Sequence, residues 1–236
     1  MKYWFEWNGV DCRNKGIILQ EMPQIIKPEE RVTHVTIPGR AGDVTLTEGD
    51  DIYESYIQTV PIIAKTLVDA QVAEKWLRGA GYVTFCNEDN LRQEARVIAP
   101  VTFSKHSRNS ECYTAEVQFY CNPLKELKNY TPQVILGDGT GLTAVINNPG
   151  DTVARPEFVI EGEGDIVITC AGRQLELTGV VSGWTIMSET EWVVYQGNVL
   201  VGACSGEFPA LEKGNNLMVC TGNITKMTMD GKFRWL

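Results

Sequence analysis

Apolar and polar residues alternate with the period of a β-strand at the start of the chain. Tyr3, Phe5 and Trp7 fall on one side of such a strand, because successive side chains point to opposite faces. Asn8-Gly9 follows directly, and this dipeptide is a strong signal for a tight turn. We therefore predict a strand that ends in a turn at these two residues.

A second strand is predicted from Val32 to Ile37. Val35 and Ile37 share one side of it with Thr33, and His34 falls on the other side. Solvent contact on that side explains a strand histidine more simply than a role as a ligand.

One segment has helical rather than strand periodicity. It reads TLVDAQVAEKWLRGAG and runs from Thr66 to Gly81. Apolar residues recur there at the spacing of one helix face, and Gly79 stands where a C-cap glycine is expected. We predict a single helix that packs this stripe on a sheet, with Trp76 in the core. The residues of the stripe are Val68, Val72, Ala73, Trp76 and Leu77.

Strand patterns resume after the helix, in YVTFCN, EARVIAPVTFS and YTAEVQFYCNP. The stretch from Asn122 to Pro132 is polar and interrupted by prolines, so it is the best domain boundary. Beyond it, short strands alternate with turns such as Ala171-Gly172 and Asp230-Gly231, the latter typical of a type I′ hairpin. This pattern indicates an antiparallel sandwich or jelly roll.

Composition places the chain among ordinary globular proteins. It has 236 residues, of which 43% are hydrophobic and 22% charged. Apolar runs stay far below the roughly 20 residues of a membrane span, and the N-terminus does not resemble a signal peptide. We expect folding in the compartment of synthesis and no membrane insertion. The net charge of −9, with 21 scattered basic residues, argues against a nucleic-acid-binding surface.

Catalytic and metal-binding patterns are sparse. The seven cysteines form no CxxC pair, so we expect reduced thiols used as small core residues. His34 and His106 are the only histidines, and no GxSxG motif supplies a nucleophile. We therefore expect no enzymatic activity, no cofactor and no metal.

Acidic residues cluster in two glycine-containing segments. Spaced carboxylates can bind Ca²⁺ or hydrolyse glycosides, but a glycine-rich turn that holds solvated acids accounts for the same composition. The segment GDGTG, from Gly137 to Gly141, lacks the lysine and the helix of a phosphate loop. The acidic clusters are Glu161, Glu163 and Asp165 in EGEGD, and Glu48, Asp50 and Asp51 in EGDD.

The six tryptophans leave a carbohydrate-binding function open. Most of them lie in alternating strands, where core packing is the default. A sugar-binding β-sandwich is therefore the alternative function to be compared with any structural role.

The segment TIPGRAGDVTLTEG admits several interpretations. Pro38 ends strand pairing, and Gly39 and Gly42 permit a tight loop around Arg40. Strand-like sequence follows Gly42, so no helix N-terminus is present to bind phosphate. The guanidinium of Arg40 has a planar set of donors suited to a neighbouring subunit. A loop in which Arg40 only caps its own backbone is the alternative.

Several motifs, in this order, resemble the distal tail proteins of siphophages. They are FEWNG, IPGRAG, KWL and QFYCNP in the first half, and the C-terminal Arg234-Trp235-Leu236. The segment GEFPALEKGNNLM resembles a Phe-Pro-x-Leu-x-x-Gly-x-Asn motif of that family, here Phe208, Pro209, Leu211, Gly214 and Asn216. Ala41 stands where the family often carries an acidic residue.

The resemblance implies a mainly β protein of two domains. Residues 1–125 would form a ring-forming β-barrel or sheet domain with one helix, and residues 126–236 a galectin-like β-sandwich. Phe208, Pro209, Leu211, Gly214 and Asn216 would have structural roles, and Pro38, Gly39, Arg40 and Gly42 would form a subunit-interface loop.

The resemblance also implies a non-enzymatic function at the virion tail tip, after assembly in the bacterial host cytoplasm. Six copies would form a hub that joins the tail tube to the host-adsorption apparatus of a phage or prophage. Partners would be the tail tube protein, the tape measure protein, and a tail-associated lysin, tail fibre or receptor-binding protein. DNA would pass through the lumen without sequence-specific contact, and an acidic chain suits such a lumen.

Overall fold

The computed structural model describes residues 3–47, 49, 51–181, 183–187, 193–196, 199–201 and 204–236. These residues are mainly β with one α-helix, as predicted. The chain divides into two compact units. Unit 1 is Met1–Lys128 with Leu236, and unit 2 is Asn129–Trp235. Within the described residues, no helix has the length and apolar character needed to cross a membrane.

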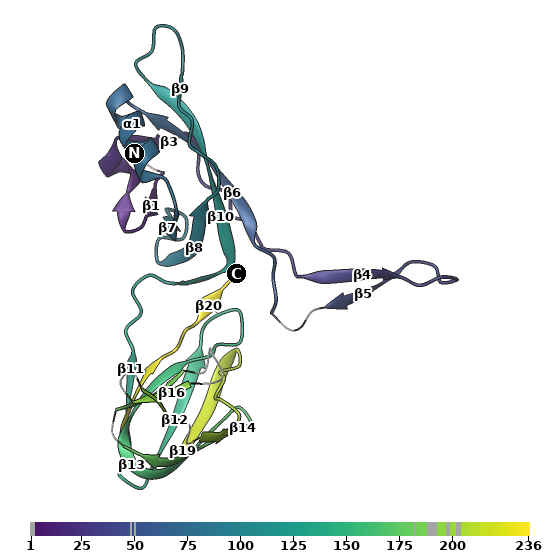
Figure 1. Cartoon of the computed structure of the whole chain (residues 1–236), viewed down its shortest axis with the longest axis vertical. Helices are drawn as coiled ribbons and strands as arrows, with labels where there is room; N and C mark the ends of the chain where they lie inside the picture. Colours follow the sequence, from purple (N-terminus) through teal and green to yellow (C-terminus); the bar gives the residue numbers. More distant parts are fainter. Residues whose placement is uncertain are drawn as a thin grey trace. The chain divides into compact units, whose positions relative to one another are not determined.

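Unit 1 is built on an antiparallel sheet with the strand order β2-β1-β7-β8-β10-β6-β3, and β9 pairs with β10 (Figure 1). Its elements are β1 Phe5–Trp7, β2 Val10–Asp11, the 3₁₀ helix η1 Cys12–Lys15, β3 Ile17–Leu19, β4 Val32–Thr36, β5 Asp43–Thr47, β6 Tyr56–Ala64, α1 Leu67–Trp76, β7 Ala80–Phe85, β8 Leu91–Val97, β9 Ser104–Lys105 and β10 Tyr113–Leu127.

Aromatic rings form the centre of the unit 1 core. Phe5, Trp7 and Phe119 have no exposed surface, as the alternation at the start of the chain predicts. The ring of Phe119 lies 5.5 Å from Phe5, 5.4 Å from Trp7 and 6.0 Å from Phe85, mostly in edge or tilted geometry. Such contacts between rings add to the burial of their apolar area, so Phe119 connects three strands of the core.

The predicted helix is present as α1, but its buried face differs from the predicted stripe. Thr66 is its N-cap, and its hydroxyl accepts a bond from Asp69 N at 3.1 Å. Ala70, Ala73 and Leu77 are buried, and Trp76 stacks on Phe5. The small alanines let the helix lie close to the sheet. The prediction for two of the valines is therefore wrong: Val68 is 66% exposed and Val72 40%.

The predicted turns have mixed outcomes. Asn8 and Gly9 take φ of 50° and 77° between β1 and β2, and Ala171 and Gly172 take 48° and 79°, as type I′ turns require. The turn prediction at Asp230-Gly231 is wrong. The positive φ falls on Lys232 instead, and no strand pairs back across this turn.

The stretch from Asn122 to Pro132, which the sequence predicts as a domain boundary, begins inside the last long strand of the unit 1 sheet. Strand β10 continues through Pro123 to Leu127, with a register shift between Cys121 and Lys125. Such a bulge accommodates a proline because it removes one pairing position. Lys125 is buried there, and its Nζ lies 2.9 Å from Oε1 of Glu88.

Unit 2 contains a nine-stranded antiparallel sheet folded around one core. Its strands are β11 Gln133–Leu136, β12 Gly141–Asn148, β13 Glu157–Cys170, β14 Arg173–Val180, β15 Trp184–Met187, β16 Val193–Gln196, β17 Val199–Val201, β18 Cys204–Gly206 and β19 Gly214–Asp230, and β20 Arg234–Trp235 follows.

Two long strands turn this sheet into a sandwich. The first half of β19 pairs with β12 and the second with β11, and the first half of β13 pairs with β15 and the second with β14. The register between β13 and β19 shifts at Glu161/Gly162 and at Glu163/Val167. Strands that change layers do so at bulges, and core residues from both halves of each strand meet in one cluster.

These shifts correct the prediction for EGEGD. The segment was expected to be a turn between two strands, but it lies inside β13 at the bulge. At this bulge β13 and β19 approach each other closely at Gly222 of β19, which has φ of +117°. A Cβ at Gly222 would lie 2.4 Å from Asp165 O, so only glycine fits there. The glycines serve the bend between layers rather than a chain reversal.

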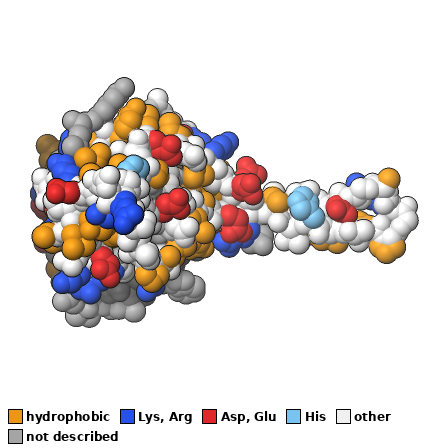
Figure 2. Space-filling view, turned by 90° about the horizontal axis from the view of Figure 1, so that it is seen from above, with side chains coloured by type: hydrophobic (Ala, Val, Ile, Leu, Met, Phe, Trp, Pro, Cys, Tyr) orange, Lys and Arg blue, Asp and Glu red, His pale blue; other side chains and the backbone are white. Residues whose placement is uncertain are grey.

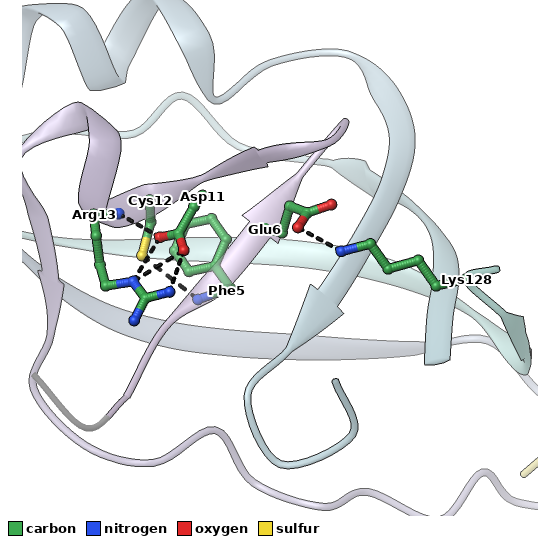
Figure 3. Close-up of polar contacts among 6 residues, drawn as sticks. All are labelled: Phe5, Glu6, Asp11, Cys12, Arg13 and Lys128. Carbon is green, nitrogen blue, oxygen red and sulfur yellow. Dashed lines mark hydrogen bonds and ion pairs between the residues drawn. The ribbon is translucent and has the colours of Figure 1, made fainter. Parts of the chain in front are cut away.

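Polar contacts hold the first strands of unit 1 (Figure 3). Asp11 caps η1 and forms an ion pair with Arg13, whose guanidinium carbon lies 5.1 Å from the ring centroid of Trp4. Partial burial of Asp11 favours its neutral form, but the bonds from Arg13 outweigh this and lower its pKa. Lys128 Nζ lies 2.6 Å from Oε2 of Glu6, which ties the end of β10 to β1.

All seven cysteines are free, and four of them are buried: Cys12, Cys121, Cys170 and Cys220. Burial raises the pKa of Cys12 to about 11 and the pKa of Cys121 and Cys220 to about 12. These thiols therefore stay neutral at physiological pH and pack as small apolar groups.

We predict that Phe119→Ala lowers the free energy of unfolding of unit 1 by ~3–5 kcal/mol, because it leaves a cavity among three rings. Tyr120→Ala is the matched control. Tyr120 is 47% exposed, so its loss should cost less than ~1 kcal/mol. Denaturant unfolding followed by tryptophan fluorescence measures both values. Equal effects of the two substitutions would contradict this account of the core.

Candidate assembly surface

Strands β4 and β5 form a separate two-stranded sheet inserted between β3 and β6. Figures 1 and 2 show it as an arm that extends from unit 1. Val32 pairs with Thr47, and the register continues regularly to Thr36 and Asp43. Most residues of both strands are exposed. An isolated two-stranded hairpin is at best marginally stable in water, so we expect contacts with another protein surface to stabilise this arm.

The arm has one apolar and one polar face. Cross-strand partners share a face, and Val35 is paired with Val44. Ile37 and Leu46 lie two positions further along the chain from these two valines and so point to the same side. Together these side chains make one face of the arm apolar. Leu46 is 53% exposed, Ile37 42% and Val35 39%. Hydrophobic side chains are visible along the arm and at its tip in Figure 2. We call these four residues the apolar face of the arm.

Hydrogen-bonding side chains occupy the opposite face. Oγ1 of Thr45 lies 3.1 Å from Nδ1 of His34, and the hydroxyl of Thr36 donates to Oδ1 of Asp43 at 2.7 Å. His34 is exposed, as the strand period predicts. These pairs satisfy one another, so the polar face is suited to water.

At the base of the arm, the segment that enters it pairs with the segment that leaves it. Arg31 N donates to Ile52 O at 2.9 Å, and Glu54 N donates to Glu29 O at 2.8 Å. The guanidinium Nε of Arg31 lies 2.8 Å from Oε1 of Glu54. This side-chain pair is exposed and contributes at most about 1 kcal/mol, so the backbone bonds define where the arm begins.

The structure places all four predicted loop residues at the tip of the arm. Gly39 and Gly42 have φ of 83° and 79°, which non-glycine residues rarely adopt. Arg40 N donates to Ile37 O at 3.1 Å, so the backbone of Arg40 closes the turn. Its side chain forms no hydrogen bond or ion pair with the part of the chain that the structure describes.

The five residues of the second predicted motif lie in unit 2, around the start of β19. Leu211 exchanges two backbone hydrogen bonds with Ala154 at 2.8 and 2.9 Å and is buried. Phe208 packs against the unit 2 core, and Pro209 is buried. Gly214 has φ of +86° at the point where the chain enters β19.

Asn216 closes this turn with its side-chain amide. Its Oδ1 accepts from Glu212 N at 2.8 Å, and its Nδ2 donates to Glu212 O at 2.7 Å and Gly214 O at 2.9 Å. Asn216 is only 4% exposed. Buried polar groups need such partners, and the residue therefore has a structural function.

Two of the three carboxylates of EGEGD form polar contacts within unit 2. Glu161 pairs with Lys226 at 2.7 Å, and Asp165 accepts from Gly179 N at 3.0 Å. Asp138 of GDGTG accepts from the backbone and hydroxyl of Thr140 and then from Gly141 N, and these bonds lower its pKa. Glu48 and Asp50 lie outside the described residues. Nowhere among the described residues do three potential metal ligands gather.

The tryptophans offer little support for a sugar-binding platform. Trp7 and Trp184 are buried, and Trp4, Trp76 and Trp235 are half-buried. The sixth, at position 192, lies outside the described residues.

The two histidines are exposed on different elements, β4 and the segment after β9, so neither is placed in a buried catalytic arrangement.

The fold defined by these elements is similar to that of a solved phage protein. The structure is similar to the crystal structure of the SPP1 Dit (gp 19.1) protein, described as a paradigm of the hub adsorption apparatus in phages that infect Gram-positive bacteria. The TM-score is 0.72 with 16% sequence identity, over 99% of both chains. No family model matches the sequence, and no curated protein matches it. The fold expected from the motif order is thus confirmed.

The sequence predicted the loop at the tip of the arm and placed Val35 and Ile37 on one side of the first strand, but it did not predict that Val44 and Leu46 share this face. The available signal was the alternation on both sides of the Pro-Gly-Arg-Ala-Gly loop. Pairing of the two strands, which sequence did not establish, brings the four apolar side chains to one face.

We predict that Asn216→Ala lowers the free energy of unfolding of unit 2 by ~1–3 kcal/mol, because it leaves part-buried backbone groups of Glu212 and Gly214 without partners. Asn215→Ala is the matched control, since Asn215 is exposed on the same strand and its loss should change stability by less than ~0.5 kcal/mol. Thermal and denaturant unfolding measure both. A neutral Asn216→Ala would show that the turn does not depend on this amide.

Proposed function

We propose that this chain is a structural hub protein at the tail tip of a long non-contractile phage or prophage tail. The observation that carries the proposal is the match to a hub protein over 99% of both chains. Fold alone does not define function. The order of the sequence motifs and an arm suited to self-association are the independent support.

In this proposal six copies form a closed ring. The ring joins the tail tube and tape measure proteins to a lysin, fibre or receptor-binding protein, and DNA passes through its lumen. The net charge of −9 suits that passage, because like charges repel. The protein acts without catalysis in the virion, after assembly in the host cytoplasm.

The arm supplies one side of the ring contact. Its apolar face is the surface that a neighbouring copy covers, and Arg40 at the tip donates to an acceptor on that copy. A ring requires a heterologous contact between two different surfaces. Unit 1 also exposes apolar residues on α1, with Leu67 52% and Val68 66% exposed, and this helix is the proposed receiving surface.

The chain should therefore assemble through the arm. Light scattering on a sizing column should give six times 26.3 kDa, about 158 kDa. Leu46→Asp should shift the mass towards 26.3 kDa, since loss of the buried leucine alone costs about 2 kcal/mol, or about 30-fold per contact. Arg40→Ala should shift the mass in the same direction.

Thr45→Asp is the matched control, because it places the same charge on the polar face of the same strand. The proposal expects this variant to keep the mass of the native chain. A strict monomer at every concentration would contradict assembly of the chain alone, and equal dissociation by both aspartates would contradict the assignment of the face.

A further inference from the structure

A pocket of about 390 Å³ in unit 2 has no role in the hub proposal. Arg155, which precedes β13, and Arg173, the first residue of β14, line it together with residues 206–210 after β18. Its volume lies in the range of small-molecule sites, about 300–1,000 Å³. The pocket therefore has room for a ligand of about one sugar unit.

Backbone bonds fix the wall made by residues 206–210. Glu207 N donates to Gln174 O at 2.7 Å at one end, and the Ala154–Leu211 pair holds the other. Gly206 has φ of +98°, and a Cβ there would lie 2.2 Å from Gln174 O. The wall is consequently preformed, which reduces the entropy that a ligand must overcome.

The charged groups of the pocket are suited to an acidic ligand that also carries hydroxyls. Arg173 and Glu207 form no ion pair with each other or with any other residue that the structure describes. Guanidinium groups bind carboxylates and phosphates through paired hydrogen bonds. A carboxylate such as Glu207 accepts bonds from hydroxyl groups, and the half-buried ring of Phe208 provides an apolar surface.

From this arrangement we infer that the pocket binds a sugar unit bearing a carboxylate or a phosphate. Arg173 binds the acidic group beside Arg155, Glu207 binds a hydroxyl group, and Phe208 contacts the ring. A single acidic side chain of a protein partner would leave most of the pocket empty and Glu207 without a hydroxyl to bind. The inference concerns unit 2 alone and does not depend on ring assembly.

Saturation-transfer NMR and calorimetry on the full chain test this inference with glucuronate and glucose 6-phosphate as probes. At least one of these acidic sugars should bind, and glucose and inorganic phosphate should each bind at least tenfold more weakly. The probe that binds more tightly shows whether the pocket prefers a sugar with a carboxylate or a sugar with a phosphate. Binding of inorganic phosphate as tight as that of glucose 6-phosphate, or of glucose as tight as that of either probe, would overturn the inference.

Variants locate the binding in the pocket. Arg173→Gln should lower the affinity for the acidic sugar at least tenfold. Glu207→Gln should raise this affinity severalfold, because the substitution removes a charge of the same sign as the ligand but keeps a hydrogen-bond acceptor. Arg96→Gln removes the same charge from an exposed position in unit 1 and should change nothing. Unchanged affinity in a folded Arg173→Gln chain, or an equal loss in Arg96→Gln, would contradict the assignment.

Discussion

A strand that carries an apolar face must have that face covered, and this requirement organises the whole chain. In unit 1 the aromatic residues of β1 and β10 are covered by one another and by α1. In unit 2 the bent strands β13 and β19 bring both their halves onto one core. The β4–β5 arm has the same alternation, but its own chain leaves its apolar face exposed. Self-association is the way in which we propose the arm meets that requirement.

Patterns that depend on neighbouring residues were predictable. The strand alternation at the start of the chain, the turn at Asn8-Gly9 and the position of the helix all follow from local rules, and each is present. The buried face of the helix was not predictable in the same way. Val68 and Val72 are more apolar than Ala70, but the close approach of helix and sheet admits the smaller residue.

Features that depend on pairing between distant segments were missed. EGEGD has the composition of a turn, and only its pairing with β19 shows that it is a bulge within a strand. Arg155, Arg173 and Glu207 are dispersed along the sequence, and the strand order brings them around one pocket. The four apolar residues of the arm likewise share a face because of the register between β4 and β5.

Hydrogen exchange of residues 32–47, followed by mass spectrometry at increasing protein concentration, tests the central claim most directly. A hairpin with no partner opens readily and exchanges fast. The account predicts that amide protection of β4 and β5 rises together with the assembled fraction, while β6 stays protected throughout. Fast exchange of the arm in the fully assembled protein would contradict the claim that a second copy covers it.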